Sequence, residues 1–194
     1  MTRTFIALEL NESLQSHLNG ILRQMAQQLP RLRWADPAGI HLTLAFLGEL
    51  SDEQLVQASE ATAQAARTVS PFTYSLSHLG TFGSPRQPRV IWVGIDEPTG
   101  TLVRLQRNLN KELVQRGFEV DARPFSPHFT LARIKAALNA DEYARLQRLL
   151  AQPHLIPSSV AYDVHSLCVM KSELARGGAK YTCLQNYTFV QGRD

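Results

Sequence analysis

Two short segments of the sequence carry the residue types needed for acid–base chemistry. His41-Leu42-Thr43-Leu44-Ala45 recurs as His128-Phe129-Thr130-Leu131-Ala132, so each copy reads His-x-Thr followed by Leu-Ala. Side chains alternate between the two faces of a β-strand. The histidine and threonine of each copy should therefore share one face, while the apolar residues between them are buried. If the two polar faces oppose each other, two imidazoles and two hydroxyls line one cleft.

That set of side chains suits an in-line displacement at phosphorus, which needs a base on the attacking oxygen and an acid on the leaving oxygen. Histidine titrates near neutral pH, so one imidazole can accept a proton while the other donates one. Threonine hydroxyls can donate to phosphoryl oxygens as charge redistributes. We therefore predict that His41 and His128 form the acid–base pair and that Thr43 and Thr130 bind the substrate.

The residue that follows each Leu-Ala pair distinguishes the two copies. On a regular strand Arg133 would point into the core with Leu131, where an unpaired guanidinium is costly. We predict that the strand ends or bulges there, so that Arg133 reaches the cleft rim and holds phosphate; a salt bridge is the alternative. The equivalent Phe46 is a candidate for stacking on a nucleobase, although packing in the core is the interpretation that we favour.

Hydrophobic periodicity and capping residues indicate an α+β fold. After each motif comes a capped helix and then two strands, and the short loops between strands favour antiparallel pairing. We expect a single bilobal domain over residues 1–194, with repeat units at about 38–97 and 124–190. Each of its two pseudo-symmetric lobes is expected to be an antiparallel sheet with helices on its outer face and the active-site cleft between the sheets. The expected strands are 4–10, 40–47, 72–82, 89–95, 128–134, 160–170 and 181–190, and the expected helices are 11–29, 51–67, 102–117 and 139–150.

Composition narrows the function class. The 194 residues carry a formal net charge of +3, which permits a phosphate-bearing ligand but is too small to predict tight nonspecific DNA binding. No apolar run reaches the ~18 residues of a membrane span, and the amino-terminal segment does not read as a signal peptide. We therefore expect a cytoplasmic protein with no membrane contact. Cys168 and Cys183 are expected to be cross-strand neighbours and, in that compartment, free thiols.

Other candidate sites are weaker. A zinc site built on the two motif histidines lacks an obvious third ligand, and no Gly-x-x-x-x-Gly-Lys-Ser/Thr loop is present to hold a triphosphate, so neither a metal nor a cofactor is expected. The remaining histidines read as ordinary surface or core residues, with His17 solvated on its helix. Basic residues near the two hairpins could line an RNA path or simply be solvated: Arg86, Arg89, Lys171, Arg176 and Lys180.

At the two motifs the chain resembles the 2H phosphoesterase superfamily, which is named for its paired His-x-Thr/Ser-x motifs. Within that superfamily it is similar to the bacterial RNA 2′,3′-cyclic phosphodiesterases, also called 2′-5′ RNA ligases. The opening Arg3–Leu8 resembles the first strand of this subgroup. His41–Gly48 and Pro127–Arg133 resemble its two motifs, including the Phe-Leu-Gly and the trailing arginine.

This resemblance implies hydrolysis of the 2′,3′-cyclic phosphate at an RNA 3′ end to a 2′-phosphomonoester, without a cofactor. It implies that His41 is the proton donor and His128 the proton acceptor, and that reverse 2′-5′ ligation of tRNA halves can occur. The partner would be RNA, with no obligate protein partner, and the protein a monomer. Two alternatives stay open: a phosphodiesterase for small cyclic nucleotides or 2′-5′ oligoadenylates, and a noncatalytic module that binds RNA or nucleotides.

Overall fold

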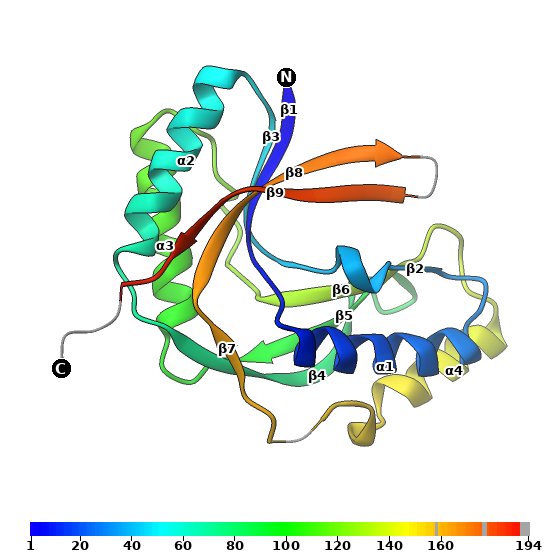
Figure 1. The fold of residues 1–194 in the computed structure, drawn as a ribbon. Helices are drawn as coiled ribbons and strands as arrows, with labels where there is room; N and C mark the ends of the chain where they lie inside the picture. The colour runs from blue at the N-terminus through cyan, green and yellow to red at the C-terminus, as the bar shows by residue number, and fades with distance from the viewer. Residues whose placement is uncertain (158, 176–177, 191–194) are drawn as a thin grey trace.

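The described part of the chain folds into two antiparallel sheets and four α-helices (Figure 1). The computed structural model describes residues 1–157, 159–175 and 178–190. The strands are β1 (Thr2–Leu8), β2 (Arg33–Trp34), β3 (Leu42–Leu50), β4 (Phe72–Ser84), β5 (Gln87–Asp96), β6 (His128–Arg133), β7 (Tyr162–Val164), β8 (Ser166–Ala175) and β9 (Gly178–Thr188). The α-helices are α1 (Glu12–Gln28), α2 (Asp52–Ala66), α3 (Thr101–Gln115) and α4 (Ala140–Leu150), and two short 3-10 helices are η1 (Pro37–Gly39) and η2 (Pro153–Leu155).

The strands form a four-stranded sheet in the order β3-β1-β8-β9 and a five-stranded sheet in the order β2-β6-β5-β4-β7. Helices α2 and α3 pack on one face of the four-stranded sheet, and α1 and α4 lie along the five-stranded sheet (Figure 1). Each sheet thus keeps one face free of α-helices, which we call its inner face, and the two inner faces are turned toward each other (Figure 1). The predicted α+β fold of two lobes is confirmed.

Local sequence explains where the helices begin and end. The predicted capping boxes are present, because Ser51 with Gln54 and Asn139 with Glu142 exchange side-chain and backbone hydrogen bonds at the starts of α2 and α4. The Asn11 side chain accepts from the Leu14 amide at the start of α1. The apolar faces of these helices join the buried residues of both sheets in one core. Within the described residues, no helix is both long enough and apolar enough to cross a membrane.

Each of the two repeat units contributes strands to both sheets. Strand β3, which follows His41, pairs with β1 in the sheet that also holds β8 and β9, whereas β4 and β5 of the same unit pair with β6, which begins at His128. Neither unit therefore forms a sheet from its own strands alone. The exchange places one motif in each sheet and holds the two lobes together through shared hydrogen-bond ladders.

The single strand predicted over residues 160–170 is wrong. The chain leaves the five-stranded sheet at the end of β7 and enters the four-stranded sheet at the start of β8, so His165 lies at the crossing point. The His165 carbonyl accepts a hydrogen bond of 2.8 Å from the Phe189 amide. The apolar pattern of residues 160–170 does not reveal where the strand breaks, because the segments before and after the change of sheet both contain buried residues.

Two expectations about single side chains are also wrong. Cys168 and Cys183 are cross-strand neighbours as predicted, but they form a disulfide rather than two free thiols. Their Cα atoms are 5.9 Å apart, a separation at which a disulfide can form. His17 is half-buried rather than solvated, since its Nδ1 lies 2.8 Å from the Tyr162 hydroxyl, which closes α1 onto the five-stranded sheet.

Packing across the β4–β5 hairpin makes a stability prediction. A Cβ added at Gly80 would lie 2.3 Å from the ring of Trp92, which occupies the inner face there, whereas a Cβ at Gly20 in α1 meets nothing within 4 Å. We expect Gly80→Ala to lower the free energy of unfolding by about 1–3 kcal/mol. The matched control Gly20→Ala should raise it by about 0.5–1 kcal/mol. Urea unfolding measures both, and equal effects of the two substitutions would contradict the packing.

Candidate active site

The two motifs occupy matching positions on the inner faces of the two sheets. His41 directly precedes β3 and His128 is the first residue of β6. In both motifs the histidine and the threonine are half-buried, while the residues next to the threonine are buried. The predicted separation of polar and apolar faces is therefore present in each motif, with the polar side chains on the face that carries no α-helix.

Both histidine rings are held in the same way. Nδ1 of His41 lies 2.8 Å from the carbonyl oxygen of Gly39, and Nδ1 of His128 lies 2.7 Å from the carbonyl oxygen of Ser126. Because a carbonyl can only accept, Nδ1 must carry the proton in both rings. The nitrogen left to take up or release a proton is Nε2, which has no hydrogen-bond partner within the described part of the chain in either ring.

A β-bulge follows the threonine in both motifs. In β3, Thr43 pairs with Ala7 and Ala45 pairs with Ile6, so Leu44 is the extra residue. In β6, Thr130 pairs with Trp92 and Ala132 pairs with Ile91, so Leu131 is the extra residue. Two consecutive residues, Leu and Ala, therefore face the core in each motif. The bulge predicted near Arg133 is confirmed, and the same irregularity lies at the equivalent point of the first motif.

The bulge turns the next residue of each strand to the inner face. Arg133 is exposed there, and no carboxylate of the described residues forms an ion pair with it, so the salt-bridge alternative finds no support. Phe46 is 55% exposed, and the guanidinium carbon of Arg3 lies 5.2 Å from the centre of its ring. The expectation that Phe46 packs in the core is wrong, because Phe46 pairs with Phe5 on the inner face instead.

Aromatic side chains that the sequence analysis did not single out pack against both imidazoles. The ring of His41 lies 4.4 Å from that of Phe5 and 4.7 Å from that of Tyr181, measured between centroids. The ring of His128 lies 4.8 Å from Phe82 and 6.2 Å from Trp92. These contacts join strands far apart in sequence, so no local pattern could identify them. They fix the orientation of each ring in addition to the Nδ1 hydrogen bond.

Burial affects the charge state of His41. Enclosure by its neighbours disfavours the imidazolium and lowers the pKa of His41 below its usual value of 6.5, an effect that the hydrogen bond to Gly39 partly opposes. In the free protein near neutral pH, burial thus favours the neutral form of His41, with the lone pair on Nε2.

Among the residues that the structure describes, neither motif histidine belongs to a group of potential metal ligands. Within the described residues, the group of His, Cys, Asp and Glu close enough to share an ion is Glu9, Cys168 and Cys183, and its sulfur atoms are in the disulfide. Of the candidate RNA-path cations, Lys171 is paired with Glu173 at 2.9 Å, and Arg86 and Arg89 are exposed at the β4–β5 hairpin. Arg176 lies outside the described residues.

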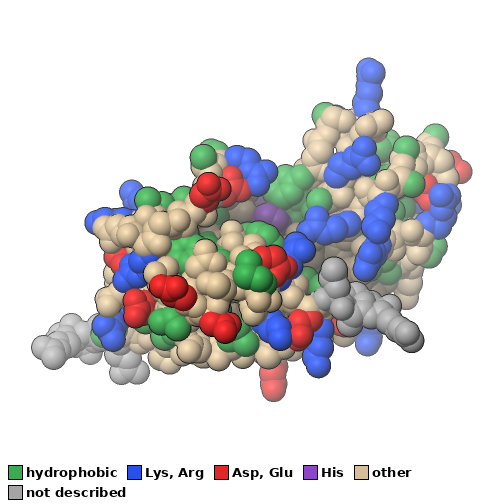
Figure 2. All heavy atoms as spheres, turned by 90° about the horizontal axis from the view of Figure 1, so that it is seen from above, with side chains coloured by type: hydrophobic (Ala, Val, Ile, Leu, Met, Phe, Trp, Pro, Cys, Tyr) green, Lys and Arg blue, Asp and Glu red, His purple; other side chains and the backbone are tan. Residues whose placement is uncertain are grey.

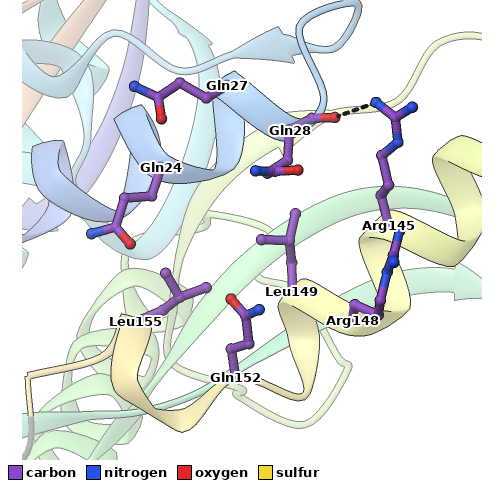
Figure 3. A pocket seen from close by; sticks show the side chains of 8 residues that line it. All are labelled: Gln24, Gln27, Gln28, Arg145, Arg148, Leu149, Gln152 and Leu155. Carbon is purple, nitrogen blue, oxygen red and sulfur yellow. Dashed lines mark hydrogen bonds between the residues drawn. The ribbon is translucent and has the colours of Figure 1, made fainter.

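The histidine visible in Figure 2 and the residues of Figure 3 lie in two different hollows of the surface. Figure 2 shows histidine at the floor of one, beside hydrophobic side chains, with several Lys and Arg side chains along one side. The other, of about 330 Å³, lies between α1, α4 and η2 and contains no histidine (Figure 3). In it the Arg145 guanidinium reaches 3.5 Å from the Gln28 carbonyl oxygen. No residue of either motif lines the pocket of Figure 3.

A family model described as LigT like Phosphoesterase matches the chain twice, over residues 8–92 and 93–181, so that each match holds one of the two motifs. The chain belongs to the LigT-like phosphoesterase family. The resemblance drawn from the two motifs is thereby confirmed. The boundary between the two matches falls inside β5, consistent with two halves that exchange strands.

Relatives of this LigT-like phosphoesterase cover nearly the whole chain. The RNA 2′,3′-cyclic phosphodiesterase of Methanothermobacter thermautotrophicus is 30% identical over 183 residues, 94% of this chain and 96% of its own. The RNA 2′,3′-cyclic phosphodiesterase of Thermotoga maritima is 30% identical over 190 residues, 98% and 97% of the two chains.

Solved structures show the same fold over the same length. A protein of Thermus thermophilus matches with a TM-score of 0.80 at 25% identity, covering 98% of this chain and 100% of its own. The structure of E. coli LigT complexed with 3′-AMP matches with a TM-score of 0.74 at 27% identity, covering 98% and 99%. The likeness therefore includes both sheets and both motifs of this LigT-like phosphoesterase.

The packing around His41 predicts how its titration responds to substitution. Replacing Tyr181 with alanine removes one wall of the enclosure and lets water reach the ring, so we expect the pKa of His41 in Tyr181→Ala to rise toward 6.5. NMR titration of the His41 ring protons measures the shift, with His154 on η2 as the internal control. A His41 pKa that falls or stays constant in Tyr181→Ala would contradict burial as its cause.

Proposed function

We propose that this LigT-like phosphoesterase hydrolyses the 2′,3′-cyclic phosphate at an RNA 3′ end to a 2′-phosphomonoester, without a metal ion. One observation carries the proposal: two histidines on facing sheets each present a free Nε2 while a carbonyl holds Nδ1. The printed names of the full-length relatives, RNA 2′,3′-cyclic phosphodiesterases, support the choice of substrate.

The reaction follows from the two Nε2 atoms. Water attacks phosphorus as Nε2 of His128, the general base, takes its proton. Nε2 of His41, the general acid, gives a proton to the departing 3′ oxygen, so the P–O3′ bond breaks and the 2′-phosphate remains. A 5′-hydroxyl in place of water would give a 2′-5′ linkage by the same steps, which is the route we propose for ligation of tRNA halves.

Four further side chains bind the substrate in this proposal. The hydroxyls of Thr43 and Thr130 lie on the same faces as the histidines and donate to the phosphoryl oxygens as negative charge develops there. Arg133, which the bulge turns inward, adds a charge-assisted hydrogen bond to phosphate. Phe46 offers an exposed ring for stacking on a base. The phosphate therefore lies nearer the five-stranded sheet and the base nearer the four-stranded sheet.

The lowered pKa of His41 has a consequence for its role as the acid. An acid must be protonated, and burial makes the protonated form scarcer in the free enzyme. The negative charge of the bound phosphodiester opposes this effect and favours the imidazolium. Exchanged roles, with His41 as base and His128 as acid, are the second candidate, because burial of His41 favours the form that accepts a proton.

Both motifs come from one chain, so we propose a monomer that needs no protein partner and acts on RNA in the cytoplasm. Product analysis tests this function against its alternatives. Incubation with RNA ending in a 2′,3′-cyclic phosphate should yield RNA with a 2′-phosphate. Hydrolysis of cyclic mononucleotides or 2′-5′ oligoadenylates but not of cyclic-ended RNA would favour the small-substrate alternative, and binding without turnover would favour the noncatalytic module.

Substitution of either motif histidine should remove most of the activity. We expect His41→Ala and His128→Ala each to lower kcat by roughly 10²- to 10⁴-fold, the usual contribution of a general acid or base. His154→Ala, which changes an exposed histidine on η2, serves as the control and should leave kcat unchanged. EDTA should have no effect on the wild-type rate, and strong inhibition by EDTA would contradict a metal-independent reaction.

A substrate with an activated leaving group separates the acid from the base. An aryl phosphodiester that releases a stable phenoxide needs no proton on the leaving oxygen, so loss of the acid costs little there. We expect His41→Ala to retain activity on that substrate and His128→Ala to lose it. The opposite pattern would contradict the proposed assignment and establish the exchanged roles.

The pH dependence of kcat/KM gives an independent check. The rate requires one ring charged and the other neutral, so kcat/KM should be bell-shaped, with two apparent pKa values that belong to the pair. The lowered pKa of His41 extends the bell toward lower pH, and it does so whichever of the two rings is the acid. A rate that does not vary with pH would contradict paired acid–base catalysis.

A further inference from the structure

An arginine outside both motifs lies directly opposite Arg133. Strand β2 has only two residues, and its register pairs Arg33 with Arg133 across antiparallel strands. Directly opposite residues project to the same face with Cα atoms about 4.5–5.5 Å apart. Because Arg133 is on the inner face, Arg33 is on it too, one strand farther out than His128 and Thr130. Both arginines are exposed.

Like charges placed directly opposite each other on a sheet destabilise it. Elsewhere such a pair is commonly offset by carboxylates, but no carboxylate of the described residues pairs with Arg33 or Arg133. Glu142, which lines the same surface hollow as the two arginines, is already bound: Oε1 lies 3.3 Å from Arg31, and Oε2 accepts from the Asn139 amide at 3.0 Å. Within the described residues, the positive charges of Arg33 and Arg133 therefore have no carboxylate to neutralise them.

The backbone around Arg33 is fixed rather than free. The indole nitrogen of Trp34 donates to the Leu29 carbonyl at 3.0 Å, and the Ala35 amide donates to the carbonyl of Leu131, the bulged residue of β6, at 2.8 Å. The bulge that turns Arg133 inward thus also anchors the segment that carries Arg33. The backbone positions that carry the two guanidiniums are therefore adjacent and fixed, which reduces the entropy lost when both side chains hold one ligand.

The surroundings are cationic as well. Arg33 and Arg133 line a hollow of about 140 Å³ with Arg31 and Lys135, and Glu142 is the one acidic residue of that lining. Along one side of the hollow that holds histidine, Lys and Arg side chains gather (Figure 2). The hollow beside Arg33 and Arg133 therefore carries an excess of positive charge, which suits a phosphate.

We propose that Arg33 and Arg133 form a second phosphate subsite, which binds the internucleotide phosphate preceding the 3′-terminal nucleotide of an RNA chain. This inference rests on the proposed function and deepens it, because it makes an RNA chain a better substrate than a cyclic mononucleotide. In this proposal Arg133 lies between the reacting phosphate and the preceding internucleotide phosphate. Arg33, one strand farther out, binds only the internucleotide phosphate. Arg33 is thus a specificity-determining residue that does not touch the reacting atoms.

The test compares two substrates and two matched variants. Arg33→Gln removes one charge from the subsite, and Arg107→Gln removes one from an exposed position on α3, which covers the outer face of the other sheet. For RNA ending in a 2′,3′-cyclic phosphate, we expect Arg33→Gln to lower kcat/KM by about ten- to a hundredfold, mainly through KM. For a cyclic mononucleotide its kcat/KM should change less than about twofold. Arg107→Gln should leave both values unchanged.

Two further readouts separate a phosphate contact from a structural role. The salt dependence of binding to RNA ending in a 2′-phosphate should become less steep in Arg33→Gln by about 0.7 in log Kd per log salt, and Arg33→Lys should restore the slope. Because the substitution relieves repulsion, the Tm of Arg33→Gln without RNA should be unchanged or higher. A lower Tm together with equal losses on both substrates would overturn the subsite in favour of a structural role.

These experiments also distinguish a failure of the subsite proposal from a failure of the proposed function. If the wild-type enzyme hydrolyses both substrates and Arg33→Gln does not affect the RNA substrate, the subsite is overturned and the function stands. If the wild type hydrolyses neither substrate, yet binds 2′-phosphate-ended RNA with a salt slope that depends on Arg33, the function is overturned and the subsite stands.

Discussion

The arrangement of this site depends on one irregularity that occurs twice, the β-bulge after each His-x-Thr. Strict alternation would place the residue after Leu-Ala in the core. Because Leu44 and Leu131 are extra residues, Leu and Ala of each motif are buried together, and the residue after them lies on the inner face. Each motif can therefore bury its apolar residues on the outer face of the sheet. It still places the histidine, the threonine and the residue after Leu-Ala on the inner face. The bulge also uses its own carbonyl at Leu131 to hold the neighbouring β2 segment.

The same device in two copies produces an asymmetric site. In the five-stranded sheet the bulge exposes Arg133 opposite Arg33, while in the four-stranded sheet it exposes Phe46 beneath the guanidinium of Arg3. One side thus offers guanidinium groups and the other an aromatic ring, although the two halves share topology and motif. The exchange of strands between halves holds these two sides in one body, so the sites for phosphate and base are fixed relative to each other by β-sheet hydrogen bonds.

Local chemistry was sufficient to predict much of this from the sequence. The capping boxes at Ser51 and Asn139, the faces of both motifs and the bulge before Arg133 follow from hydrogen bonding and from the cost of burying a charge. Long-range pairing was not predictable. The change of sheets at His165 lies within a continuous apolar pattern, the two-residue strand of Arg33 is too short to show a period, and the packing of Tyr181 on His41 joins residues 140 positions apart.

In the proposed mechanism both histidines act on one phosphorus atom from opposite sides. The most direct measurement is a crystal structure of the protein with a nucleoside vanadate that imitates the five-coordinate phosphorus of the displacement. We expect Nε2 of His41 and Nε2 of His128 each to lie within about 2.7–3.2 Å of an apical or adjacent oxygen of the same vanadium. Vanadate bound at one histidine while the other ring contacts only solvent or protein would contradict it.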